Sequence, residues 1–258
     1  EWISNGKLRL SWGVLGNQDI GDMMFTDQYN ITNVDGGKGY IWSYKGNPEL
    51  TWERTSTIDL GLEFSVGNYV DVEFDYFYKK TDNMLFPRYV APSLGYGGYY
   101  VNDAAMENQG IEFDLKAHLV DTRNVKLDLR LNGGYYRNKM LQMPIDGYDE
   151  NGDEMRMVMS GGMAVGHSTA DWYMVHYEGV NENGEATYTA YYDANKGNFG
   201  TTAAELVGEG EKEDNYIGSV YEYTLKNPDA DIRTTSVSGD LSSYAGSNYT
   251  GKSYMPDL

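Results

Sequence analysis

The segment TIDLGLEFSVGNYVDVEFDYFY, residues 57–78, decides the fold, because apolar and polar side chains alternate along it with a period of two. One face collects the apolar side chains Ile58, Leu60, Leu62, Phe64, Val66, Val70, Val72, Phe74, Tyr76 and Tyr78. The opposite face is mostly polar or charged. Gly67-Asn68 separates the two runs, and this dipeptide is typical of a tight hairpin turn. The segment therefore predicts two antiparallel amphipathic strands.

The same alternation occurs on both sides of this hairpin. It runs through residues 7–14, 111–119 and 125–132, and a turn at 121–124 joins the last two runs. Residues 1–139 are therefore expected to form five amphipathic strands. The connections between them alternate in length, at about 35–40, two, about 25–30 and four residues. Outer-membrane barrels show this asymmetry, because their periplasmic turns are tight and their extracellular loops are long.

The composition favours an all-β fold and excludes several functions. The 258 residues include 31 Gly and 24 Tyr but only 6 Pro, which favours many strands joined by turns. The formal charge of −19 argues against a nucleic-acid partner, and the absence of Cys excludes disulfides and thiolate metal sites. No run of 18 apolar residues offers a transmembrane helix, but a barrel strand needs only about 9–11 residues with alternate positions facing lipid.

The charges on the polar faces indicate a water-filled lumen rather than the core of a β-sandwich. A sandwich interior would have to bury several charged groups, whereas a lumen hydrates them. Tyr76, Tyr78 and Tyr135 fall at the outer ends of outward-running strands, where barrels carry an aromatic girdle. We therefore expect an all-β chain that forms part of a large antiparallel transmembrane β-barrel with long extracellular loops. Five strands cannot close such a barrel, so we expect more barrel on both sides.

Residues 140–258 have a different character. The clean alternation ends near Met140, and the remainder is rich in Gly and Tyr and contains 20 Asp and Glu against 6 Lys and Arg. By strand parity this part lies outside the cell. An Asn183-Gly184 turn signal between Tyr173–Val180 and Glu185–Tyr192 predicts at least one hairpin. We therefore divide the chain into five barrel strands with two long extracellular loops, residues 1–139, and an acidic extracellular excursion with hairpins of its own, residues 140–258.

Four ordered stretches resemble one known family. GKLRLSWG (residues 6–13) with GNQDIG (16–21) comes first, followed by NPELTWE (47–53), DYFYKKT (75–81) and MENQGIEF (106–113). They are similar to signatures of the SusC/RagA-type TonB-linked (TonB-dependent) outer-membrane transporters. The resemblance covers residues 1–140, and a thinner echo follows at 165–166 and 172–193. There Gly166-His167-Ser168-Thr169 departs from the family's Gly-x-Pro-x-Gly.

The resemblance implies an importer in the outer membrane of a Gram-negative bacterium. Such a transporter is a barrel of about 22 strands with an N-terminal plug and a TonB box. A SusD-like surface lipoprotein caps it and helps to capture oligosaccharides or peptides, so the implied partners are this lipoprotein, TonB, the substrate and outer-membrane lipid. The plug and TonB box are absent from this chain, which we interpret as an internal or C-terminal barrel fragment. The resemblance implies no enzyme activity and no cofactor.

Two groups of aromatic residues are the best candidates for contact with substrate or partner. They could stack on sugar rings or pack against a partner protein, although aromatic side chains also pack within loops. The candidates are Tyr96, Tyr99, Tyr100, Trp172, Tyr173, Tyr191 and Tyr192.

No metal or catalytic site is expected. Residues 149–153 resemble the start of a calcium loop, but the sixth and twelfth positions are Glu154 and Ser160 instead of Gly and Glu, which favours a solvated turn. His118, His167 and His176 lack a second His at zinc-motif spacing, and we expect hydrogen-bonded polar roles, with His118 lining the lumen. No nucleophile elbow, Walker loop or dinucleotide fingerprint occurs.

Two alternatives stay open beside the transporter. One is a soluble surface β-protein that binds glycans or mediates adhesion. The other is a secreted glycoside hydrolase, since carboxylates on neighbouring strands face one another and a catalytic pair of carboxylates is the core of that chemistry. Extraction only with detergent would favour the barrel, and a monodisperse protein in plain buffer would contradict it.

Overall fold

The computed structural model describes residues 3–34, 36–148, 151–159, 161–196 and 216–253. The chain divides into two compact units. Unit 1 contains Glu1–Asp146 and Ala164–Thr169, and unit 2 contains Gly147–Met163 and Ala170–Met255. Strands dominate both units, and no helix of the described ranges is long and apolar enough to cross a membrane.

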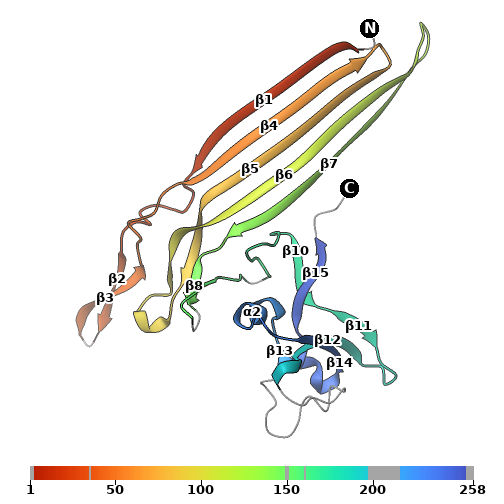
Figure 1. Ribbon diagram of the computed structural model, residues 1–258. Coiled ribbons are helices and arrows are strands. Elements are labelled where there is room, and N and C mark those ends of the chain that lie inside the picture. Colours follow the sequence, from red (N-terminus) through yellow and green to blue (C-terminus); the bar gives the residue numbers. More distant parts are fainter. Residues whose placement is uncertain (1–2, 35, 149–150, 160, 197–215, 254–258) are drawn as a thin grey trace. The chain divides into compact units, whose positions relative to one another are not determined.

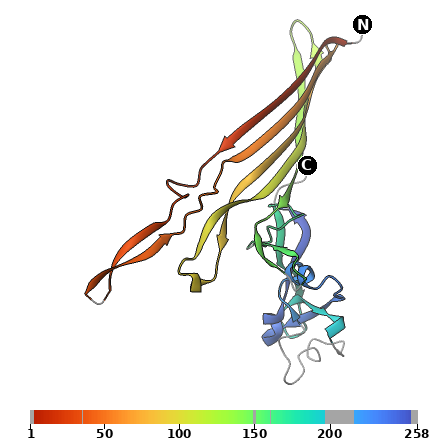
Figure 2. The ribbon, with the colours of Figure 1, turned by 60° about the vertical axis from the view of Figure 1, so that its left-hand side comes forward.

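Unit 1 is built on one five-stranded sheet, and all its neighbouring strands are antiparallel (Figure 1). Its strands, in spatial as well as sequence order, are β1 (Ile3–Asn17), β4 (Glu53–Val66), β5 (Val70–Tyr89), β6 (Gly98–Asp121) and β7 (Lys126–Gln142). Figure 2 shows them as a single curved layer. The two tight turns predicted around Gly67-Asn68 and residues 121–124 join β4 to β5 and β6 to β7. The sheet confirms the all-β antiparallel fold expected from the alternation.

The strand register places the apolar side chains on one face. Residues directly opposite each other in an antiparallel pair share a face. The register therefore sets up a row across all five strands that consists of Leu10, Leu60, Tyr76, Ile111 and Tyr135. Side chains on this apolar face are open, with exposed fractions of 71% at Leu8, 74% at Leu10 and 73% at Trp12. A water-soluble sheet would bury this face, so the open apolar face is the defining feature of unit 1.

The predicted connection of about 25–30 residues between the third and fourth strands is wrong. β5 continues to Tyr89 and β6 begins at Gly98, so only residues 90–97 connect them, including the 3-10 turn η1 (Pro92–Leu94). The ladder passes through register shifts between Thr81 and Met84 and between Met84 and Phe86. These irregularities interrupt the period-two alternation by which the other strands are recognised, so the sequence pattern does not mark this part of the ladder.

The long connection between β1 and β4 contains a hairpin that the sequence pattern did not reveal. It consists of β2 (Gln28–Val34) and β3 (Gly37–Tyr44). Buried Gly46 fixes its base, because a Cβ atom there would lie 2.2 Å from the carbonyl carbon of Thr26. In Figure 1 the hairpin and the β5–β6 connection extend from the end of the sheet opposite the two tight turns.

The described part of unit 2 contains three small sheets, a short helix and 3-10 turns. The first sheet pairs β10 (Asp171–Val175) with β15 (Ser247–Ser253). In the second, β12 (Ala186–Asp193) pairs with β11 (Tyr177–Val180), β13 (Tyr216–Ile217) and β14 (Ile232–Ser238). The third sheet pairs β8 (Ile145–Tyr148), with which the chain enters unit 2, with β9 (Glu154–Arg156). The other elements are η2 (Ala194–Lys196), α2 (Val220–Lys226) and η3 (Gly239–Tyr244).

The Asn183-Gly184 hairpin prediction is confirmed in part. Val180 pairs with Ala186, and Gly184 takes a φ of 84°, which suits Gly at such a turn. Tyr173 does not continue this hairpin, because it belongs to β10 and pairs with Tyr249 of β15. The centre of unit 2 is small and contains the buried residues Ala190, Ile217 and Val237.

Candidate functional sites

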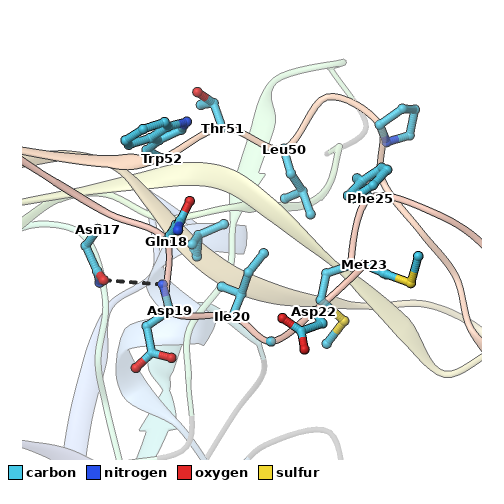
Figure 3. A pocket seen from close by; sticks show the side chains of 14 residues that line it. Asn17, Gln18, Asp19, Ile20, Asp22, Met23, Phe25, Leu50, Thr51 and Trp52 are labelled. Carbon is cyan, nitrogen blue, oxygen red and sulfur yellow. Dashed lines mark hydrogen bonds between the residues drawn. The ribbon is translucent and has the colours of Figure 1, made fainter.

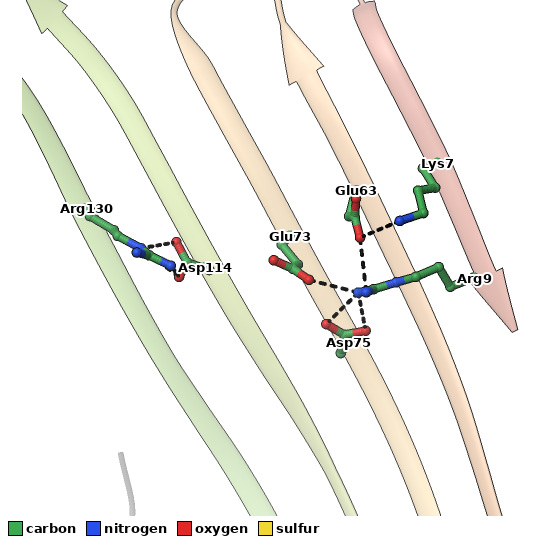
Figure 4. A network of polar contacts seen from close by, with 7 residues as sticks. All are labelled: Lys7, Arg9, Glu63, Glu73, Asp75, Asp114 and Arg130. Carbon is green, nitrogen blue, oxygen red and sulfur yellow. Dashed lines mark hydrogen bonds and ion pairs between the residues drawn. The ribbon is translucent and has the colours of Figure 1, made fainter. Parts of the chain in front are cut away.

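Arg9 organises the polar face of the unit 1 sheet. Its Nη2 atom lies 2.8 Å from Glu73 Oε1 and 3.0 Å from Asp75 Oδ1, and its Nη1 atom lies 3.1 Å from Glu63 Oε1 (Figure 4). Lys7 adds a further contact with Glu63 at 3.4 Å. One guanidinium on β1 therefore joins carboxylates of β4 and β5.

Gly61 makes this network possible. In the register it stands between Arg9 of β1 and Asp75 of β5. A Cβ atom at this position would lie 2.7 Å from Arg9 Nε and 2.5 Å from Asp75 Oδ1. Because Gly61 has no side chain, space remains open above β4, and the Arg9 side chain crosses the strand there.

The same face carries other ion pairs further along the sheet. Arg130 Nε donates to both carboxylate oxygens of Asp114, at 2.9 and 2.8 Å (Figure 4). His118 lies between two carboxylates, with Nδ1 2.7 Å from Asp128 Oδ1 and Nε2 3.2 Å from Asp71 Oδ2. These side chains remain partly exposed, so water can hydrate the pairs as it would in an aqueous lumen.

The motif residues 16–21 and 47–53 converge on one cavity of about 690 Å³ (Figure 3). Glu53 connects its walls, because Oε2 accepts from Asn17 Nδ2 at 2.8 Å and Oε1 accepts from the Leu85 amide at 2.9 Å. Trp52 covers Gly16, where a Cβ atom would lie 2.9 Å from the indole ring. The lining residues are Asn17, Gln18, Asp19, Ile20, Gly21, Asp22, Met23, Met24, Phe25, Pro48, Leu50, Thr51, Trp52 and Leu85.

Aromatic residues from two connections meet around Trp42. Its ring centroid lies 5.9 Å from that of Tyr29 in a stacked arrangement and 5.2 Å from that of Tyr96 edge to face, while Tyr96 lies 6.4 Å from Tyr99. We call Tyr29, Trp42, Tyr96 and Tyr99 the Trp42 cluster. It joins the β2–β3 hairpin to the β5–β6 connection. Such pairs add about 0.5–1.5 kcal/mol each beyond the apolar area that they bury.

A charged pair lies beside the Trp42 cluster. Lys45 Nζ is 2.8 Å from Asp27 Oδ1 and 5.7 Å from the centroid of the Trp42 ring. The hydrogen bond from Lys45, helped by the Gly46 amide, lowers the pKa of Asp27, and Asp27 raises the pKa of Lys45. The buried Trp42 Nε1 faces this carboxylate but forms no hydrogen bond of good geometry with the described residues.

Three of the seven predicted contact residues are therefore brought together in unit 1. Tyr96 and Tyr99 belong to the Trp42 cluster, and the Tyr100 amide donates to the Tyr44 hydroxyl at 3.3 Å beside it. Sequence reasoning missed Trp42 and Tyr44. The alternate positions Tyr40, Trp42 and Tyr44 of β3 are the sequence feature that could have identified them.

The other four predicted residues lie in unit 2 and have different surroundings. Tyr173 is packed inside, with its ring centroid 4.7 Å from that of Tyr249. Burial raises the pKa of Tyr249, as expected for an enclosed phenol. Trp172 is adjacent in β10, alternates to the other side of the strand and is 44% exposed. Tyr191 and Tyr192 are half-buried in β12, where they pair with β13 and β14.

No group of three or more His, Cys, Asp or Glu residues in the described ranges is arranged to hold a metal ion. Residues 149 and 150 of the calcium-like stretch lie outside those ranges. His118 lies on the polar face between Asp71 and Asp128, and His176 Nδ1 lies 3.2 Å from the Thr189 hydroxyl.

Comparison with known proteins connects this geometry to a family. The protein-family model described as TonB dependent receptor-like, β-barrel, matches residues 1–254. TonB-dependent receptor P3 of Formosa agariphila is 27% identical over 226 residues, which are 81% of this chain and 22% of that protein. TonB-dependent receptor SusC of Bacteroides thetaiotaomicron is 25% identical over 240 residues, which are 89% of this chain and 23% of that protein. The chain thus spans less than a quarter of these relatives.

Solved structures give the same fold. The RagAB peptide importer in its closed-closed state aligns over 99% of this chain and 24% of its own chain, with a TM-score of 0.66 and 20% identity. The RagAB peptide transporter aligns over 75% of this chain and 22% of its own, with a TM-score of 0.60 and 24% identity. The family match over nearly the whole chain agrees with the sheet, and the chain belongs to the TonB-dependent receptor β-barrel family, among SusC- and RagA-type relatives.

Proposed function

We propose that this chain forms part of the wall and extracellular vestibule of a TonB-dependent importer in the outer membrane of a Gram-negative bacterium. The observation that carries the proposal is the two-faced sheet of unit 1. Leu8, Leu10 and Trp12 are open on one face, and the pairs around Arg9 and Arg130 occupy the other. Both faces are stable in the wall of a membrane barrel, because the apolar face contacts lipid and the charged face contacts water in the lumen.

The dimensions of the apolar face support a transmembrane position. From Val70 to Tyr78, β5 rises about 26 Å at about 3.3 Å per residue. The apolar band of an outer-membrane barrel is about 25 Å tall, and strand tilt reduces the height that one strand covers. We place residues 1–139 in the barrel wall with the tight turns on the periplasmic side. Residues 140–258 then belong to the extracellular side.

Transport without chemistry is consistent with the relatives. The curated relatives P3 and SusC are both named TonB-dependent receptors. We propose that energy arrives through TonB. The ion pairs of the polar face then line the barrel lumen, with His118 among them.

The substrate is proposed to be an oligosaccharide or a peptide, delivered with the help of a SusD-like surface lipoprotein. SusC is among the curated relatives, and RagAB, named as a peptide importer, is among the structural neighbours. The aromatic contact residues are proposed to be Tyr96, Tyr99, Tyr100, Trp172, Tyr173, Tyr191 and Tyr192. The Trp42 cluster supports the roles of Tyr96 and Tyr99, because it gathers aromatic rings on connections at one end of the sheet, and Tyr100 lies beside it against Tyr44.

A matched pair of substitutions on β4 tests the membrane placement in the complete polypeptide. Leu62 lies on the apolar face, and Ser65 lies on the polar face, where its hydroxyl donates to Asp71 at 2.7 Å. L62K should reduce the amount of assembled barrel in outer-membrane fractions several-fold, since Lys at the bilayer centre costs about 2–4 kcal/mol. S65K should assemble normally. Normal assembly of L62K, or a monodisperse wild-type protein in detergent-free buffer, would show that the sheet is not a barrel wall.

Uptake assays in a strain deleted for the complete gene address the substrate. Complementation should restore uptake of labelled oligosaccharides or of labelled peptides. Restoration of neither class in a strain whose protein is correctly assembled would refute the import proposal.

A further inference from the structure

The apolar face changes character sharply towards the ends of the strands that carry the long connections. The last fully apolar or aromatic row is that of Leu10, Leu60, Tyr76, Ile111 and Tyr135. The next row consists of Trp12, Ile58, Tyr78, Gln109 and Arg137. The row after that consists of Val14, Ser56, Lys80, Glu107 and Lys139. Charge therefore first appears on this face at Arg137, and the next row adds Lys80, Glu107 and Lys139.

Arg137 and Lys139 form a basic pair on β7. They are two residues apart on the same side of one strand, so their Cα atoms are separated by about 7 Å. Asn138 between them faces the opposite side, where its Oδ1 accepts from the Thr169 amide at 2.8 Å. Both basic residues are exposed, and neither takes part in the ion pairs found among the described residues.

Among the described residues, the neighbouring acids form no ion pair with Arg137 or Lys139. Arg137 stands opposite the neutral Gln109 in the register. Glu107 stands opposite Lys139, and its Oε2 accepts from the Tyr78 hydroxyl at 3.1 Å. Asp82 lies 2.8 Å from Lys80. Two exposed cations beside an open apolar face, one of them opposite a neutral residue, favour an anionic partner.

The rest of β7 indicates what this partner is. Below the basic pair the same side of the strand carries Tyr135 and then Gly133, Leu131 and Leu129, and the two leucines are 59% and 56% exposed. An aromatic ring followed by an apolar strip fits the interface of a bilayer and its acyl chains. Guanidinium and ammonium groups bind phosphate by charge-assisted hydrogen bonds.

We infer that Arg137 and Lys139 dock the phosphate-bearing headgroup of an anionic lipid of the outer leaflet, whose acyl chain lies along Leu131 and Leu129. This inference rests on the proposed placement of the sheet in the membrane. The basic pair supplies charge complementarity, and the apolar strip favours a lipid over free phosphate.

Native mass spectrometry of the complete polypeptide tests the inference. The detergent-purified protein is offered equal amounts of phosphatidylglycerol and phosphatidylcholine, and the ratio of bound lipids is measured. The wild type should prefer phosphatidylglycerol several-fold, and R137Q/K139Q should lower that ratio close to one. R137K/K139R should retain the preference. The control K38Q/K252Q removes the same charge from exposed positions outside the apolar face and should match the wild type.

Several outcomes would overturn the inference. An unchanged ratio in R137Q/K139Q, an equal loss in K38Q/K252Q, or displacement of the lipid by millimolar inorganic phosphate would each contradict a lipid site at this pair. If R137Q/K139Q does not fold, the wild-type protein still tests the inference. Its preference for phosphatidylglycerol over phosphatidylcholine should fall as the salt concentration rises, and a preference that does not change with salt would contradict a charge-based lipid site. A protein that assembles in membranes but shows no preference refutes only this inference, whereas failure to assemble refutes the proposed function.

Discussion

Arg9 reaches across a whole strand to Asp75, and the two charged groups meet 3.0 Å apart above Gly61. The contact links β1 to β5, which are not neighbours in the sheet. It depends on the absence of a side chain at position 61, since both partners lie within 2.7 Å of the place that a Cβ atom would take. The interior wall of the proposed barrel is thus held by an ion network that a single methyl group would disturb.

Gly61→Ala should destabilise the sheet. Either Arg9 and Asp75 separate or the strands shift, and such overpacking costs about 1–3 kcal/mol. The effect can be measured in the complete polypeptide by gel electrophoresis after heating, because a folded barrel and its heat-unfolded form migrate differently. The midpoint temperature of this change in mobility should be lower for Gly61→Ala. Gly13→Ala is the control, because no atom lies within 4 Å of a Cβ atom at that position on β1. Equal midpoints for the two variants would disprove the role of Gly61.

Acid should loosen the loops around Trp42. The pKa of Asp27 is lowered below its ordinary value of 3.8 by Lys45, so the stability that this pair contributes is present above that value and is lost as pH falls through the folded pKa. The pKa of Lys45 is raised above 10.5, so its contribution is lost only in strong alkali. Tryptophan fluorescence should therefore change below about pH 4. Asp27→Asn should show the changed spectrum already at neutral pH, and a wild-type spectrum there would contradict this account.

Asp193→Ala should weaken unit 2. This carboxylate is only 4% exposed and accepts hydrogen bonds from the Asn195 amide, the Asp231 amide and the Tyr223 hydroxyl. Leaving such groups unsatisfied costs about 1–3 kcal/mol each when they stay buried. Limited proteolysis and hydrogen exchange should report faster opening of β12 and α2. Asp229→Ala, at an exposed position, should behave like the wild type.

Removal of the aromatic rings at Tyr96 and Tyr99 should reduce function more than stability. Y96A/Y99A takes two rings from the Trp42 cluster on a connection outside the sheet, so import and lipoprotein capping should fall while assembly persists. Tyr69→Ala, at the tight turn between β4 and β5 and 72% exposed, is the matched control. Import and capping at wild-type levels in Y96A/Y99A would exclude a contact role for this group.

Strands were predicted correctly where apolar and polar side chains alternate along the chain, because this pattern can be read from neighbouring residues alone. Alternation at residues 57–78 is a local signal, since lipid or solvent on each face selects the side chain at every second position. The alternation did not reveal the extension of β5 and β6 beyond Met84, because register shifts near this residue interrupt the pattern while the two strands remain paired. The β2–β3 hairpin was missed because its alternation, Tyr40, Trp42 and Tyr44, covers only three positions, and Tyr29 and Tyr40 remain exposed.

The sequence by itself determined the number of strands in the five-stranded sheet of unit 1, the two faces of that sheet and, through its motifs, the family. The tertiary structure alone decided which distant residues meet. Residues 16–21 and 47–53 were recognisable as motifs, but only folding places them around one cavity. Arg9 meets Asp75 only because Gly61 lies between them in the register, and Trp42 meets Tyr96 only because two connections leave the same end of the sheet. Periodicity specifies the direction of each side chain relative to its own strand, whereas contacts across strands depend on register and loop path, which no local pattern encodes.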